Sequence, residues 1–215
     1  NTTGCENTAV GRQALEANTT GIRNVAVGFG AMLCNTSGND NTAVGRCTMK
    51  LNTTGTDNTA MAKDALVFNT TGCQNTAIGK SALYLNTTGA HNVAVGKDSL
   101  ASNTTGQNNV AVGFVALTSV TTAYENVGVG REALYNVTTG GCNVAVGRDA
   151  GRAITTGSNN IMIGRGSCAD TASTANSTSI GENVVSISGS VTFGNGSTDS
   201  RIAFGATSIT APSDQ

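Results

Sequence analysis

Residues 7–23 read NTAVGRQALEANTTGIR, and close copies of this stretch fill most of the 215-residue chain. We number the repeat from its first residue, an Asn at position 1, which recurs every 17 residues without insertion or deletion at Asn7, Asn24, Asn41, Asn58, Asn75, Asn92, Asn109, Asn126, Asn143 and Asn160. A short, fixed period is typical of stacked repeat architectures. The sequence therefore predicts an all-β fold, a parallel β-solenoid (β-roll) with a strict 17-residue coil.

The composition supports a narrow core rather than an ordinary globular one. The chain has 28 Gly and no Trp, aromatic residues make up 4% and charged residues 12%. A core of large side chains cannot be assembled from this material, whereas a repeated core of Val, Ala, Thr and Leu can. The net charge of −1 predicts no attraction to nucleic acid, and no apolar run is long enough for membrane insertion.

Two glycine columns predict two corners in each coil. Position 5 is Gly in ten of the eleven turns from Gly11 to Gly181, with Ala62 as the exception, and position 15 is Gly in eight of nine turns. A Gly kept in one column indicates positive φ or a close backbone approach. Positions 1–5, between these corners, alternate as a short strand, with Val or Thr at positions 2 and 4 and mostly Ala at position 3.

The Ala column at position 3 allows two interpretations. Either Ala lines a tight interior while Val and Thr are half exposed, or the strand is buried on both faces and its Ala face packs against another chain. We favour the second, because strands buried on both sides lose their polar alternation. On that interpretation, Glu at Ala77 and Ala94 would abolish oligomers.

The second segment, positions 8–14, reads ALxxNTT. A Leu or Met column occupies position 9, and apolar residues are frequent at position 11. This alternation favours a second strand, although G-x-x-A-L is also compatible with one helical turn. The Thr pair at positions 13 and 14 suits stacked strands, because Thr is β-branched and its hydroxyl can bond along the column.

Polar columns are also arranged along the repeat. We predict that the ten position 1 Asn side chains form a structural amide ladder at the ~4.8 Å strand spacing. Position 6 carries eight of the 12 basic residues, and acids occur at positions 7 and 17. A solvated edge with paired charges is the preferred interpretation of these columns over a stripe that binds polyanions.

The repeat extends to residue 181, so we divide the chain into a solenoid, 1–181, and an atypical β segment, 182–215, that caps or connects it and ends in a polar tail containing Pro212, the only Pro. Because the chain begins in mid-repeat without an initiator Met, it is expected to be part of a longer polypeptide.

The motif NTAVG followed by x-x-A resembles the head repeats of trimeric autotransporter adhesins. The longer unit NTAVGRQALEANTTG is similar to repeats of phage tail fibres and of large surface proteins of aquatic microbes and viruses. The resemblance covers Asn1 to about Gly181. It implies a shaft or head role, self-association as a homotrimer or filament, and a location outside the cell or on a virion, with a host surface protein or glycan as the class of partner.

Enzyme chemistry finds no support in the sequence. The single His, His91, has no sequence neighbours that would complete a metal site or a catalytic triad, and glycine-rich phosphate loops are absent. We therefore expect no enzymatic activity, no catalytic residues, no metal site and no cofactor.

Two residue types could be modified. Seven NTT-type corners are N-glycosylation sequons, which would be surface acceptors in a eukaryotic secretory pathway and need no sugar elsewhere: Asn18, Asn35, Asn52, Asn69, Asn86, Asn103 and Asn136. Among the six cysteines, the spacing of Cys47 from Cys73 and of Cys142 from Cys168 predicts disulfides between neighbouring chains, with free thiols as the alternative.

These observations predict a structural, non-enzymatic fibre that provides reach, rigidity and attachment. An ice-binding solenoid is the first alternative, because the Thr pairs could form a ladder; strand alternation would leave only one Thr column outward. A glycan-binding module is another alternative, and it would need clustered exposed aromatic residues.

Overall fold

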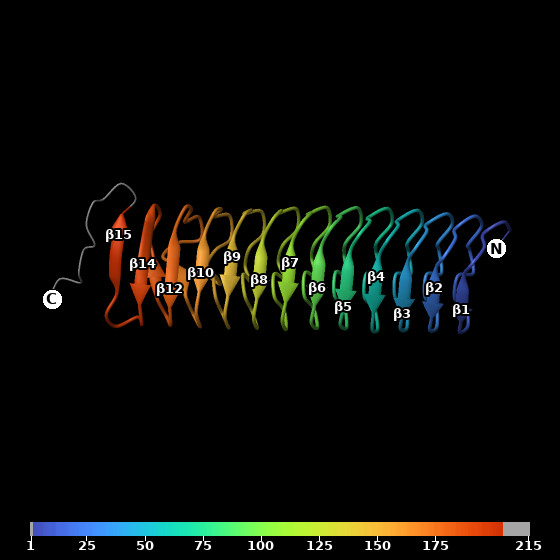
Figure 1. The fold of residues 1–215 in the computed structure, drawn as a ribbon, viewed down its shortest axis with the longest axis horizontal. Coiled ribbons are helices and arrows are strands. Elements are labelled where there is room, and N and C mark those ends of the chain that lie inside the picture. Colours follow the sequence, from blue (N-terminus) through green and yellow to red (C-terminus); the bar gives the residue numbers. More distant parts are fainter. Residues whose placement is uncertain (1, 204–215) are drawn as a thin grey trace.

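A computed structural model describes residues 2–203, which form a rod of stacked coils with β1 and β15 near its opposite ends (Figure 1). The described residues contain short strands and no helix. The strands are β1 (Thr8–Val10), β2 (Val25–Val27), β3 (Thr42–Val44), β4 (Thr59–Met61), β5 (Thr76–Ile78), β6 (Val93–Val95), β7 (Val110–Val112), β8 (Val127–Val129), β9 (Val144–Val146), β10 (Ile161–Ile163), β11 (Cys168–Ala169), β12 (Thr178–Gly181), β13 (Val185–Ser186), β14 (Ser190–Gly194) and β15 (Ser200–Ala203).

One long sheet runs the length of the rod. In the described chain it contains 13 strands, and successive strands from β1 to β10, followed by β12 and β14, pair in parallel. The register places equivalent repeat positions side by side, for example Ala43 beside Ala60 and Ala60 beside Ala77. The predicted all-β parallel solenoid with a 17-residue coil is therefore confirmed. At ~4.8 Å per strand, the sheet is about 55–60 Å long.

The coil changes after residue 181. Thr178 of β12 pairs with Val191 of β14, a step of 13 rather than 17 residues, and β14 then pairs with β15 in antiparallel fashion. The short strands β11 and β13 form a second, two-stranded sheet. The segment from residue 182 thus adds a shorter coil and an antiparallel end strand to the same sheet. The predicted tail with Pro212 lies outside the described residues.

Each strand has one buried and two outward side chains. The position 3 Ala residues of β2–β7 and β9, such as Ala77 and Ala94, are completely buried within the single chain, whereas positions 2 and 4 are half-buried or exposed. Ala77 and Ala94 belong to the same core cluster as Leu83 and Leu100 of the position 9 column. The prediction that the Ala face packs against another chain is therefore wrong. The coil is so flat that its own Leu column fills the space beside Ala.

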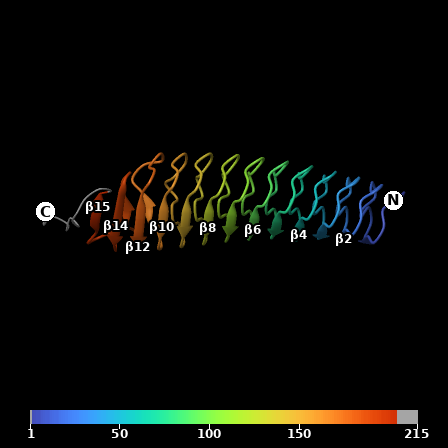
Figure 2. The same ribbon diagram turned by 45° about the horizontal axis from the view of Figure 1, so that its top comes forward.

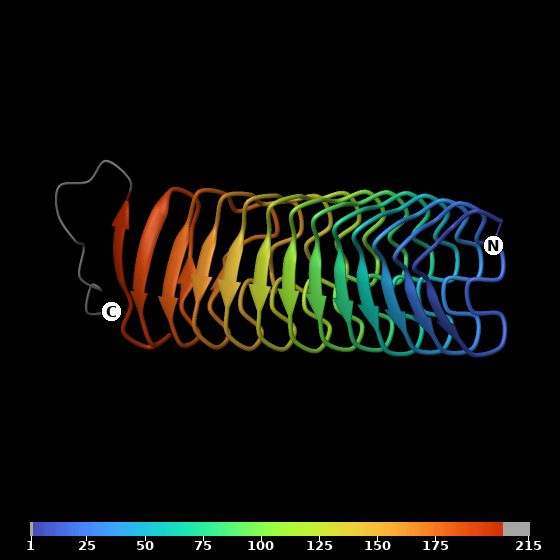
Figure 3. The same ribbon diagram turned by 45° about the vertical axis from the view of Figure 1, so that its right-hand side comes forward.

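The second segment is not a strand. Residues 11–20, for example, form turns, and Figures 2 and 3 show these segments returning on the side of the rod away from the long sheet. Left-handed backbone at position 9, with φ of 50° at Leu83 and 49° at Leu100, bends the chain so that positions 8 and 9 are both buried. Hydrogen bonds between turns persist: the amide of Leu83 donates to the Ser99 carbonyl at 3.0 Å. The alternation that suggested a strand arises from repeated bends.

The position 5 corner explains its glycine column. At Gly79, φ is +137°, and an added Cβ would lie 2.5 Å from the carbonyl oxygen of Gly96 in the next turn. Ala62, the one exception, has a φ of 96°. L-residues rarely adopt either conformation, so the sequence carries a strained position at Ala62.

We expect Ala62→Gly to stabilise the chain by about 1 kcal/mol, and Gly79→Ala to destabilise it by roughly 2–3 kcal/mol, because the second change adds both strain and a clash. Urea unfolding followed by circular dichroism measures both changes. Equal effects of the two substitutions, or a loss of stability in Ala62→Gly, would contradict this explanation of the corner.

Candidate functional site

The position 1 Asn side chains form a continuous hydrogen-bonded ladder along the rod. The Nδ2 of Asn75 donates to Oδ1 of Asn58 at 3.1 Å and to the carbonyl of Gly89 at 2.9 Å. Its own Oδ1 accepts the backbone amide of Asn92 at 3.0 Å and the side-chain amide of Asn92 at 3.2 Å. The same pattern runs from Asn7 to Asn160, where Ser177 ends it by donating its hydroxyl to Asn160 Oδ1 at 2.7 Å. These amides join both corners of each coil to the next coil.

A second Asn ladder, which the sequence analysis missed, occupies position 12. The Nδ2 of Asn69 donates to Oδ1 of Asn52 at 2.8 Å and to the carbonyl of Gly72 at 2.9 Å. The ladder stops where position 12 becomes Val120, so Oδ1 of Asn103 is buried without a hydrogen-bond partner. Its column of Asn at a constant spacing of 17 was the available signal. Its six members are Asn18, Asn35, Asn52, Asn69, Asn86 and Asn103.

This ladder contradicts N-glycosylation at six of the seven predicted acceptors. All six position 12 side chains are at most 1% exposed, and a sugar on Nδ2 would occupy the space of the neighbouring coil. The prediction is wrong for these residues, because the sequon arises from the ladder and its Thr corner. Asn136 is different: it lies at position 11, is exposed, and donates to the carbonyl of Arg152 at 2.8 Å.

The Thr pair lies at an irregular corner, so its two side chains do not face opposite sides as in a strand. The hydroxyl of Thr53, at position 13, donates to the carbonyl of Thr70 in the next turn at 2.9 Å. The backbone amides of residues 53–55 also donate to that carbonyl. The position 14 residues are exposed in eight of the nine turns. Both Thr columns therefore reach the surface, one half-buried and one exposed.

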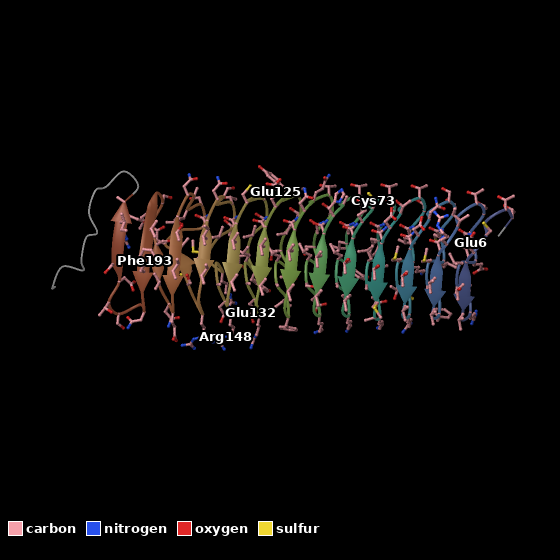
Figure 4. All side chains as sticks on the ribbon, in the orientation of Figure 1. Glu6, Cys73, Glu125, Glu132, Arg148 and Phe193 are labelled. Carbon is pink, nitrogen blue, oxygen red and sulfur yellow. The ribbon has the colours of Figure 1, made fainter. Side chains whose placement is uncertain are left out.

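Charged residues lie along the two long edges of the outward strand surface. Figure 4 shows Glu6 and Glu125 along the edge where the strands begin, and Glu132 and Arg148 along the edge where they end. Ion pairs reduce the charge on both edges, as between Arg131 and Glu132 at 2.8 Å. A hydrogen bond from Arg131 lowers the pKa of Glu132, as Arg23 lowers that of Asp40. These short-range pairs support the solvated-edge interpretation.

The six cysteines, all in the described region, are free thiols in the single chain. Burial, followed by a hydrogen bond to Glu125, raises the pKa of Cys142, and burial raises the pKa of Cys168. Because the thiolate is the reactive form, these shifts disfavour oxidation of both residues. The proposed links between Cys47 and Cys73 and between Cys142 and Cys168 of different chains stay a prediction.

Other surface features carry little chemistry. In residues 2–203, no group of three or more His, Cys, Asp or Glu side chains is placed to hold a metal ion, and His91 is exposed. A depression of about 310 Å³ lies beside Tyr124, and one of about 390 Å³ lies beside Arg152 and Cys168. None of the helices searched in the described residues could span a membrane, because that part of the chain has no helix.

The geometry defines the class of protein as a single-chain parallel β-solenoid with internal Asn ladders. No family model, curated protein or solved structure was found to match this sequence. The functional argument therefore rests on the geometry and on the repeat sequence.

Proposed function

We propose that this chain is a rigid, non-enzymatic shaft or head segment of an extracellular or virion-surface fibre. The observation that carries the proposal is the continuity of bonding along the rod. Backbone hydrogen bonds connect successive coils, and the position 1 ladder adds side-chain bonds from Asn7 to Ser177. Bending such a rod would stretch buried hydrogen bonds in many coils together, and an unmade buried bond costs about 1–3 kcal/mol.

The repeated design supports a mechanical role in another way. In a solenoid each coil contacts mainly its neighbours, so added coils extend the rod without changing its cross-section. The resemblance of NTAVGRQALEANTTG to repeats of fibres and surface proteins supports placing the chain outside the cell or on a virion. Self-association into a trimer or filament belongs to the same proposal.

Immunogold electron microscopy tests this function. An antibody raised against the folded chain should label thin fibres on the surface of the source cells or virions, and preincubation of the antibody with purified chain should remove the label. Gold particles confined to the cell interior would contradict the proposal.

Ice binding is a second candidate, because the corner geometry removes one objection to it. Both Thr columns reach the surface, and the position 13 hydroxyls are fixed by hydrogen bonds at the spacing of the coils. Thermal hysteresis in a millimolar solution, reduced by Lys at Thr71, Thr88 and Thr105, would support this function. Ordinary freezing behaviour would exclude it.

A further inference from the structure

The outward side chains of positions 2 and 4 form a continuous surface that we call the strand face. Within β1–β10, β12 and β14 it consists entirely of Val, Ile, Thr, Met and Phe. Val10 is 57% exposed, Ile78 39% and Val146 40%. Solvent-facing sheet surfaces are normally polar, and long exposed apolar surfaces mark interaction sites. The strand face therefore has the composition of a surface that is covered by a partner.

Two charged columns border the strand face. The acidic edge, at position 17, contains Glu6, Asp40, Asp57 and Glu125, and the basic edge, at position 6, contains Arg12, Arg46, Lys63, Lys80, Lys97, Arg131, Arg148 and Arg165. Four bases pair with the acid that follows them, as Lys63 does with Asp64 at 3.4 Å, whereas Arg12, Arg46 and Lys80 have no ion pair within residues 2–203. The basic edge thus keeps an excess of positive charge opposite a negative edge.

We propose that the strand face binds a second copy of this chain, with the two rods parallel, in register and related by a two-fold axis along the rod. Such an axis reverses the direction across the strands, so the basic edge of each copy lies against the acidic edge of the other. An antiparallel pair of rods would instead bring like-charged edges together. Charge complementarity of this kind fixes register and orientation at interfaces. The proposal does not depend on the fibre role.

The distribution of charge among the strands agrees with this register. In the two-fold pair, the position 17 residue before a strand faces the position 6 residue after the same strand of the other copy. Every acid on the acidic edge then faces a base, in the pairs Glu6 with Arg12, Asp40 with Arg46, Asp57 with Lys63, and Glu125 with Arg131. The one base at position 17, Arg23, would face Phe29, so no like charges meet along β1–β10.

The size and shape of the face favour two copies. A surface about 55 Å long and about 15 Å wide, estimated from strand spacing and the rise per residue, buries on the order of 800 Å² per chain. This is the size of a standard specific interface. Three such faces around a common axis would enclose a channel that Val and Thr side chains are too short to fill, and unfilled apolar space is unfavourable.

Analytical ultracentrifugation at about 10 μM tests the pairing. We expect twice the chain mass of 21.5 kDa. Lys at both Val95 and Val129, on the strand face, should give a monomer, whereas Lys at both Thr88 and Thr122, on the exposed corner, should leave the dimer intact. Circular dichroism checks that each variant is folded. A monomeric or trimeric wild-type chain, or dissociation only by the corner substitutions, would overturn the proposal.

A charge exchange on β4 tests the parallel register without altering the apolar face. Asp57→Lys and Lys63→Asp should each weaken the dimer several-fold, because each places like charges together at two symmetric contacts. The double variant should recover the wild-type dissociation constant to within about twofold. If the double variant is weaker than both single variants, the parallel register is wrong.

Discussion

Replacing Ala94 with Glu is expected to unfold the chain, whereas replacing the adjacent Val95 with Glu should leave it folded. Ala94 is completely buried, in register with Ala77 and Ala111, and Val95 points outward from the same strand. An unpaired carboxylate in this narrow core costs at least several kcal/mol, a large part of the 5–15 kcal/mol that stabilises typical domains. Val95→Glu removes only a half-exposed side chain.

Far-UV circular dichroism with urea titration distinguishes the two variants. Ala94→Glu should show no native baseline, and Val95→Glu should retain a cooperative transition within about 1 kcal/mol of wild type. Because Val95 also lies on the strand face, its variant is additionally expected to be monomeric. A folded Ala94→Glu chain would mean that position 3 does not face the interior.

Asn75→Ala is expected to destabilise the solenoid by roughly 3–5 kcal/mol. The substitution leaves the Gly89 carbonyl, the backbone amide of Asn92 and one side-chain proton of Asn92 without partners. Each such loss costs about 1–3 kcal/mol, and the neighbouring coils cannot move far enough to replace the bonds.

Asn136→Ala is the matched control, because Asn136 is exposed and makes one printed side-chain bond, to the Arg152 carbonyl at 2.8 Å. It should change the free energy of unfolding by less than about 1 kcal/mol. Urea titrations of both variants provide the comparison. Similar effects at the two positions would show that the ladder contributes no more than a surface amide does.

The period of the sequence was sufficient to predict the fold, because identical residues every 17 positions can satisfy one another only by stacking. Local conformation was harder to predict. Leu83 and Leu100 lie in left-handed backbone, which is uncommon for bulky residues and has no signature in the alternation of apolar side chains. The segment was therefore interpreted as a strand, although its alternation comes from bends.

The direction of the Ala column could not be fixed from composition, because a strand with apolar residues on both faces fits either orientation. The thinness of the coil decides it: only a side chain as small as Ala leaves room for the Leu column within one chain. The Asn residues at position 12 were similarly ambiguous. A sequon and a buried amide ladder have the same sequence, and burial separates them.

Nuclear magnetic resonance of the chain would test the stacked solenoid most directly, through contacts between the side-chain amides of Asn residues. The structure predicts a series of through-space contacts between residues 17 apart, such as the Asn75 side chain and the Asn92 backbone amide, from Asn7 to Asn160. Contacts at a different spacing, or none between successive Asn residues, would contradict the ladder and the rod built on it.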